Sequence, residues 1–267
     1  MAFHGHFFRS SRDRAKVFSG KHKGGDMVEK SVPYDYNGGQ FEGLIVYDDA
    51  VTAKRPAILM QPDWLGVCDH SIEMAHEVAG QDYVMMVADM WGVGYGEKEK
   101  SFDDLMKISR EVRADIDFLR GCGATAYEAL SAEANALGVI DPDKKGAIGY
   151  CIGGGFALEH ARNGADFKGT VVFHVTLPNP VDIETKPNIK GRVLALHGSA
   201  DPVTPKLQMD ALEAELTEAG VDWQVMMFGH AVHSFCDKGQ NSDALRYDEK
   251  LCQQSYRMMH DFFAETL

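Results

Sequence analysis

The stretch Lys145-Gly-Ala-Ile-Gly-Tyr-Cys-Ile-Gly-Gly154 decides the fold. Residues 145–150 have the pattern of a short buried strand, and residues 152–163 have that of a helix. Between them, Cys151 stands in the spacing Gly-x-Cys-x-Gly, which is that of a nucleophile elbow with Cys in place of the usual Ser. The flanking glycines suit a sharp turn in which strand and helix approach closely. A thiolate would be favoured at the start of the helix, whereas the alternative interpretation is a buried cysteine in a glycine-rich turn.

Strand and helix patterns alternate on both sides of this stretch, from about residue 55 onward. Short apolar strands separated by helices predict a mostly parallel sheet that is covered on both faces. The expected strands are 56–60, 83–88, 145–150, 169–173, 192–196 and 223–227. The expected helices are 70–79, 101–119, 124–137, 152–163, 205–219 and 242–263, with Gly121 and Gly123 ending the second of them.

The segments before residue 55 differ from the rest. Residues 29–36 and 40–47 alternate between apolar and polar, with Asn37-Gly-Gly39 between them, which predicts an antiparallel hairpin at the sheet edge. Residues 1–26 are basic and are expected to form a flexible tail. Because no linker or repeat interrupts the remainder, residues 27–267 are expected to form one α/β domain.

Composition narrows the possible functions. The 267 residues contain 27 Lys and Arg against 40 Asp and Glu, a net charge of −13, which argues against a nucleic-acid partner. No run of 18 apolar residues is present, so no membrane association is expected. The five cysteines are odd in number and form no C-x-x-C pair, which favours a reducing, cytoplasmic location without a disulfide framework. The oligomeric state is left open.

An acid and a histidine follow the cysteine in the order of an α/β-hydrolase triad. Asp201 lies in Leu196-His-Gly-Ser-Ala-Asp-Pro202, directly after a predicted strand. His233 lies in Gly229-His-Ala-Val-His-Ser-Phe235, after the next strand. Both would reach the carboxyl edge of the sheet, where open α/β sheets place their sites. We therefore predict a Cys151–His233–Asp201 triad.

Other histidines give competing interpretations. His230 is an alternative base, although His233 is preferred. The pair His230-x-x-His233 has no third ligand at a supporting spacing, so no metal is predicted. His197 is interpreted as a structural residue at a strand end. The glycines at 92, 94 and 96 lack the full nucleotide-binding pattern, and no cofactor is expected.

These motifs together resemble the dienelactone hydrolase family. The matching segments are Gly-Tyr-Cys-Ile-Gly-Gly at 149–154, His-Gly-Ser-Ala-Asp-Pro at 197–202, His-Ser-Phe at 233–235, Gln-Pro-Asp-Trp-Leu-Gly at 61–66 and Ala-Asp-Met-Trp at 88–91. The similarity covers roughly residues 28–265. It implies an α/β-hydrolase fold for this part of the chain.

The resemblance also implies a role for each site residue. Cys151 would be the nucleophile, His233 the base, and Asp201 the group that orients the imidazole. The backbone N–H groups of Trp64 and Ile152 would form the oxyanion hole. These roles agree with the chemistry of a thiolate, which needs a base within hydrogen-bond reach and fixed donors for the developing oxyanion.

Three departures from the family pattern matter: one concerns the cysteine, one concerns the substrate, and the third is the tail at 1–26, which has no counterpart in the family. The family has a Glu in the oxyanion loop that influences the cysteine, and Asp63 stands there as an accessory residue one methylene shorter. Its type members hold a substrate carboxylate with arginines, where Val93 and Asp237 align in this chain. An Asp near the pocket would repel a carboxylate, so a dicarboxylate is not the expected substrate.

The expected function is hydrolysis of a small ester or lactone through an acyl-thioester on Cys151. Trp91, Tyr95 and Phe235 are expected to line the substrate pocket, where aromatic side chains would suit a bulky neutral compound. Two alternatives remain open. The thiolate could attack activated phosphotriesters or other electrophiles, or the chain could be a non-catalytic binding protein with a hydrolase fold.

Overall fold

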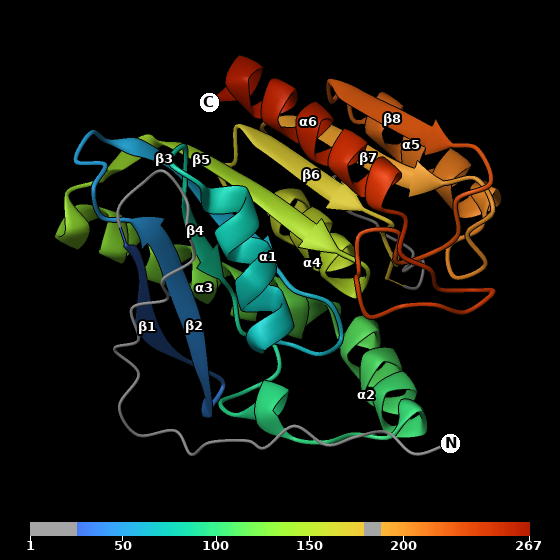
Figure 1. Ribbon diagram of the computed structural model, residues 1–267, viewed down its shortest axis with the longest axis horizontal. Coiled ribbons are helices and arrows are strands. Elements are labelled where there is room, and N and C mark those ends of the chain that lie inside the picture. Colours follow the sequence, from blue (N-terminus) through green and yellow to red (C-terminus); the bar gives the residue numbers. More distant parts are fainter. Residues whose placement is uncertain (1–25, 179–187) are drawn as a thin grey trace.

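An eight-stranded sheet forms the centre of the molecule (Figure 1). The structure is a computed structural model, and it describes residues 26–178 and 188–267. The strands lie in the order β1-β2-β4-β3-β5-β6-β7-β8. Neighbours from β4 to β8 pair in parallel, whereas β1 with β2 and β2 with β4 pair antiparallel. This confirms the predicted α/β-hydrolase fold with its antiparallel N-terminal edge.

The strands follow the predicted segments, except that β5 begins at Ile140, five residues before its expected start. Their bounds are β1 Met27–Tyr36, β2 Gly39–Asp48, β3 Arg55–Gln61, β4 Val84–Val87, β5 Ile140–Tyr150, β6 Gly169–Phe173, β7 Arg192–Gly198 and β8 Trp223–Phe228. Asn37 and Gly38 both have positive φ in the turn between β1 and β2, the geometry that a two-residue hairpin turn requires. Since β3, β5, β6 and β7 are parallel, their carboxyl ends share one edge, and β5 and β7 lead there into Cys151 and Asp201.

Helices cover both faces of the sheet. Those of the described residues are α1 Asp69–Ala79, α2 Phe102–Ala114, α3 Ile116–Leu137, α4 Ile152–Arg162, α5 Lys206–Glu218 and α6 Glu249–Thr266, with a short 3-10 helix, η1, at Tyr95–Glu97. Helices α1 and α6 lie on one face, and α3, α4 and α5 lie on the other (Figure 1). Helix α2 lies beyond the carboxyl edge of the sheet in the same view.

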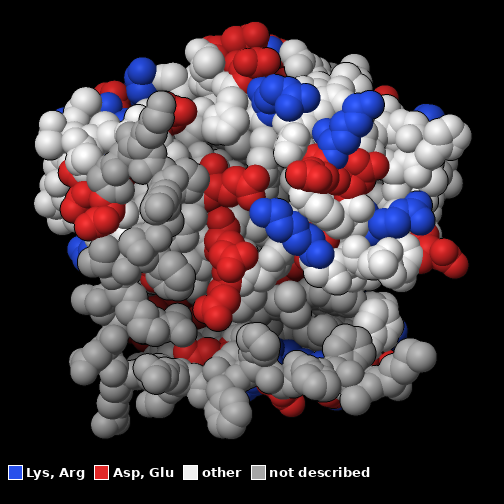
Figure 2. Space-filling model, in the orientation of Figure 1, with Lys and Arg blue, Asp and Glu red and all other residues white. Residues whose placement is uncertain are grey.

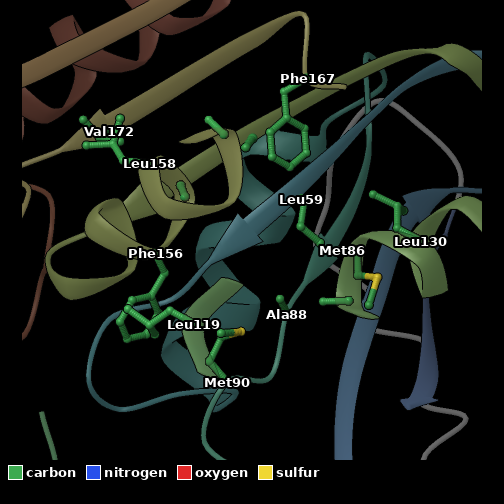
Figure 3. Packing of buried hydrophobic residues seen from close by; sticks show 14 of the residues in the cluster. Leu59, Met86, Ala88, Met90, Leu119, Leu130, Phe156, Leu158, Phe167 and Val172 are labelled. Carbon is green, nitrogen blue, oxygen red and sulfur yellow. The ribbon is translucent and has the colours of Figure 1, made fainter. Parts of the chain in front are cut away.

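Two apolar layers separate the sheet from these helices. Alternate strand residues enter opposite layers, so that Leu59 packs toward α3 and α4 while Ile58 and Met60 pack toward α1 and α6. Figure 3 shows the first layer, in which Leu119 of α3 and Phe156 of α4 lie near Leu59 and Met86. The near-continuous apolar strands are therefore explained by burial on both faces.

The break between α2 and α3 corrects one expectation. The helix ends at Asp115, whose side chain caps the next helix, and not at Gly121 or Gly123. Both glycines lie inside α3. Glycine is needed at these two positions, because a Cβ on Gly121 would lie 1.9 Å from the Tyr36 hydroxyl, and one on Gly123 would lie 1.5 Å from the His160 ring. They permit close packing where the sequence indicated a helix end.

Two further expectations fail near the C-terminus. The last helix begins at Glu249 and not near residue 242, because residues 241–246 form isolated bridges with each other and with His233. Cys236 and Cys252 form a disulfide, whereas the odd number and spacing of the cysteines predicted no disulfide framework. The two cysteines are 16 residues apart and are brought together only by the turn into α6.

The predicted basic tail at 1–26 lies almost entirely outside the described residues. Figure 2 shows one face of the molecule, on which Lys and Arg side chains are scattered among Asp and Glu. Within residues 26–178 and 188–267, no helix is both long and apolar enough to cross a membrane.

Candidate active site

Cys151 lies at the sharp turn between β5 and α4. Its backbone has φ 55° and ψ −123°, a conformation that L-residues rarely adopt, and its N–H donates to the Phe173 carbonyl at 3.1 Å. A Cβ on Gly149 would lie 2.2 Å from the Gly153 carbonyl oxygen, and one on Gly153 would lie 2.2 Å from the Gln61 and Pro62 carbonyl oxygens. Glycine is therefore required on both sides of the cysteine, and the turn presents Sγ at the start of α4.

Cys151, His233 and Asp201 form one hydrogen-bonded chain. Nε2 of His233 lies 3.1 Å from Sγ of Cys151, and Nδ1 lies 2.7 Å from Oδ2 of Asp201. His233 comes from the segment after β8, and Asp201 from the segment after β7. His230, the competing base, is exposed. The structure thus brings together the three residues that sequence reasoning singled out.

The charges of this chain favour a protonated His233. Burial disfavours the imidazolium, but the thiolate of Cys151 and the carboxylate of Asp201 outweigh burial and raise the pKa of His233 to about 10. The Asp201 carboxylate is held in place by its own loop, because its Oδ1 accepts hydrogen bonds from the N–H groups of Val203 at 2.7 Å and Thr204 at 3.0 Å. The arrangement can supply a thiolate nucleophile and a proton donor side by side.

The two backbone N–H groups expected to form the oxyanion hole come from segments that lie against each other. Ile152 is the first residue of α4, and Trp64 follows the β3 carboxyl end. The loop after β3 rests directly on the start of α4, as the contacts of Gly153 with the Gln61 and Pro62 carbonyls show. Within the described residues, neither N–H donates a backbone hydrogen bond. Both are therefore available to an acceptor.

Asp63 lies in a buried cluster with His70 and Asp237. Oδ1 of Asp63 accepts from the Leu65 N–H at 2.9 Å, and Asp63 makes no hydrogen bond to Cys151. Burial, together with the Asp237 carboxylate, raises the pKa of Asp63 to about 6, against the opposing effects of the Leu65 N–H and two nearby histidines.

The Asp63, His70 and Asp237 cluster contains side chains that metals can use as ligands. One ligand atom from each of the three lies within 4.8 Å of the others. Nε2 of His70 lies 3.3 Å from Oδ1 of Asp237, so the ring faces that carboxylate. The cluster places two buried carboxyl groups beside the candidate site.

The three aromatic residues that were predicted to line the substrate pocket do not lie together in the structure. Trp91 and Tyr95 stack with ring centroids 5.1 Å apart and line an open hollow of about 640 Å³, whose other lining residues are Asp35, Gly38, Gln40, Gly92, Val93 and Lys98. None of these is a triad member. Phe235 is only 1% exposed and packs on His174 and Phe228, so its assignment to the pocket was wrong. It forms the core beneath His233, because its side chain points inward after the turn at Ser234.

Three residues near the sulfur were missed by sequence reasoning. Thr176 has its hydroxyl 3.5 Å from Sγ of Cys151, and His174 packs edgewise on the His233 ring at 5.2 Å. Arg113 of α2 is half-buried and near enough to Cys151 for the thiolate to raise its pKa, against a larger lowering by burial. Only the position of His174 and Thr176 just after β6, at the carboxyl edge, could have indicated them.

The chain is similar to several known hydrolases. A dienelactone hydrolase-like promiscuous phosphotriesterase from metagenomic libraries has a structure that is 30% identical, with a TM-score of 0.80 over 90% of this chain and 98% of that one. A putative carboxymethylenebutenolidase of Synechocystis is 25% identical over 77% of this chain and 85% of its own length. One of Yersinia pestis is 22% identical over 85% of each. The family model described as "Dienelactone hydrolase family" matches residues 41–267, and the chain therefore belongs to that family.

Proposed function

We propose that this protein hydrolyses a small carboxylic ester or lactone through an acyl-thioester on Cys151. The observation that carries the proposal is the chain of contacts from Sγ of Cys151 to His233 at 3.1 Å and on to Asp201 at 2.7 Å. A thiolate beside an imidazolium that a carboxylate orients is the arrangement that nucleophilic acyl transfer needs.

In the first half-reaction, the thiolate of Cys151 attacks the carbonyl carbon and forms the C–S bond. The carbonyl oxygen becomes an oxyanion, which the N–H groups of Ile152 and Trp64 would stabilise. As this tetrahedral adduct collapses, the C–O bond to the leaving group breaks, and the imidazolium of His233 gives its proton to the departing oxygen.

In the second half-reaction, neutral His233 takes a proton from water as the water oxygen attacks the thioester carbon. Collapse of the second adduct breaks the C–S bond, releases the acid and restores the thiolate, with the proton left on His233. No cofactor enters either half-reaction, and Asp201 keeps the ring oriented throughout.

The substrate we propose is neutral or carries few negative charges. Asp63 and Asp237 are buried close to His233, and two carboxylates there would oppose the entry of a dicarboxylate. Arg113 provides a cation near the sulfur, where a single anionic group could be accepted.

The test compares initial rates on p-nitrophenyl acetate for the wild type and Cys151→Ala. We expect the variant to lose at least about 10³-fold in rate, as triad members generally do. Cys68→Ala is the matched control, because Cys68 is a free, partly exposed cysteine outside the triad, and it should keep the wild-type rate. Equal rates for wild type and Cys151→Ala would contradict the thiol mechanism.

A second candidate function is the hydrolysis of activated phosphotriesters at the same thiolate. It is favoured by the 30% identity to a protein described as a promiscuous phosphotriesterase. Diethyl p-nitrophenyl phosphate releases the same chromophore as the ester, so one assay ranks the two substrates. A well-folded protein without activity on either class of compound would favour a non-catalytic binding role.

We also propose a cytoplasmic location, which the disulfide makes testable. Reducing compartments usually keep cysteines as thiols, so a Cys236–Cys252 bond would be unusual there. Thiol counting after rapid alkylation in cells would separate the cases: five free thiols support the cytoplasm, and three argue against it.

A further inference from the structure

The segment after β6 passes directly over the nucleophile elbow. The His174 N–H donates to the Leu196 carbonyl at 2.8 Å, and the Thr176 N–H donates to the Cys151 carbonyl at 2.8 Å. His174 has φ 36°, which turns the chain toward α4. A Cβ on Gly155 would lie 2.5 Å from the Thr176 carbonyl oxygen, so glycine in α4 is what lets the segment approach. The backbone of Thr176 is therefore fixed relative to Cys151.

The Thr176 side chain completes a triangle with the two reacting groups. Its Oγ1 lies 3.5 Å from Sγ of Cys151 and 3.5 Å from Nε2 of His233, while those two atoms lie 3.1 Å apart. Thr176 is only 7% exposed, so water does not readily replace its hydroxyl. Sγ and Nε2 make no other side-chain hydrogen bonds within the described residues.

We propose that Thr176 is a positioning residue of the Cys151–His233 pair. Its hydroxyl donates a hydrogen bond to the thiolate, and its oxygen accepts part of the hydrogen bond from the protonated Nε2. A hydroxyl is suited to this place because it is both donor and acceptor. The proposal rests on the proposed function, since it assigns Thr176 to the same nucleophile.

The thiolate is the state that depends on Thr176. A partly buried sulfur anion needs donors, because burial in a low-dielectric site disfavours the charged form. In this chain the donors on Sγ are the imidazolium of His233 and the hydroxyl of Thr176. Removing the hydroxyl leaves His233 as the one side-chain donor on Sγ among the described residues. The population of the reactive ion pair should therefore fall, while the space available to the substrate stays the same.

The experiment measures alkylation of Cys151 by iodoacetamide against pH, with the labelled peptide quantified by mass spectrometry. Thr176→Val keeps the shape and removes the hydroxyl, whereas Thr176→Ser keeps the hydroxyl. The matched control is Thr170→Val, an equally buried threonine at the opposite end of β6 that makes no side-chain hydrogen bond to a described residue. The same variants are assayed for kcat and KM on p-nitrophenyl acetate.

For Thr176→Val, we expect the alkylation rate near pH 7 to fall about tenfold and its midpoint to move to higher pH. We expect kcat to fall with little change in KM. Thr176→Ser should restore both readouts, and Thr170→Val should behave as wild type. If Thr176→Val does not fold, as judged by thermal melting, Thr176→Ala replaces it in the same comparison.

Two outcomes would overturn the proposal. A wild-type alkylation profile in Thr176→Val would show that the hydroxyl does not act on the thiolate. Equal losses in Thr176→Val and Thr176→Ser would assign the effect to packing of the methyl group. Failure of the proposed function is recognised separately, because full activity of Cys151→Ala would reject the nucleophile while the alkylation profile still reports on Thr176.

Discussion

The nucleophile and its base are held in place by two very different regions. Residues 149–155, the elbow, form a short consecutive turn whose shape depends on glycines two residues from Cys151. Residues 229–248, the histidine loop, carry His233 through an irregular path with positive φ at His230 and Ser234. The elbow takes its shape from consecutive residues, although Gly153 and Gly155 also meet the loop after β3 and Thr176. The histidine loop has no such regular turn and is held by partners from other elements.

The contacts of the histidine loop show this dependence. The Ala200 N–H donates to the Ala231 carbonyl at 2.9 Å, and the His230 N–H donates to the Ser199 hydroxyl oxygen at 3.0 Å, so the segment after β7 holds the loop. The disulfide from Cys236 joins the loop to α6. A site of this kind combines one locally specified group with one that only the assembled fold can place. Changes in the two regions should therefore fail in different ways.

The largest effect is expected from Gly153→Ala in the elbow. The added methyl group would lie 2.2 Å from the Gln61 and Pro62 carbonyl oxygens, which are backbone atoms that cannot turn away. We expect the free energy of unfolding to fall by about 3 kcal/mol or more, as measured by urea denaturation. The control is Gly229→Ala in the histidine loop, where a Cβ meets nothing within 4 Å. Equal stability of the two variants would contradict the packing argument.

A smaller effect is expected from Cys252→Ser, which releases the histidine loop from α6. The disulfide closes a loop of 16 residues, and opening it should lower the free energy of unfolding by about 2–3 kcal/mol. Thermal melting of the wild type with and without dithiothreitol provides the control, since reduction should reproduce the effect of the substitution. A melting temperature unaffected by either change would reject the disulfide as a support of the loop.

The smallest effect is expected at Asp63. This residue lies in the loop after β3, close to Asp237 of the histidine loop. Burial raises the pKa of Asp63 to about 6, so the folded chain holds a proton between pH 4 and 6 that the unfolded chain has released. Stability should therefore fall as the pH rises through this range. Asp63→Asn removes this dependence and should be more stable than the wild type above pH 6, by about 1–2 kcal/mol.

Denaturation curves at pH 4, 5, 6 and 7 would measure this difference. Asp35→Asn is the matched control, because Asp35 is exposed on β1 and should leave the pH dependence unchanged. A wild-type slope in Asp63→Asn would show that another group holds the proton.

Much of the fold could be predicted because its signals are local. The parallel strands β4, β6 and β7 are apolar runs that both layers bury, and Asn37-Gly38 specifies the hairpin turn through its positive φ values. The break at Asp115 was missed because Gly121 and Gly123 read as helix breakers. Their true role depends on Tyr36 and His160, which are far away in sequence.

The candidate site likewise has features that short segments specify and features that only tertiary packing specifies. The sequence by itself determined the elbow and the order of Cys151, Asp201 and His233, because strand ends and glycine spacing are properties of short segments. Only the tertiary structure decided that Phe235 belongs to the core, that Cys236 pairs with Cys252, and that Thr176 faces the sulfur. These facts depend on distances between segments that no local pattern encodes, since side-chain partners are selected by the packing of the whole sheet and its helices.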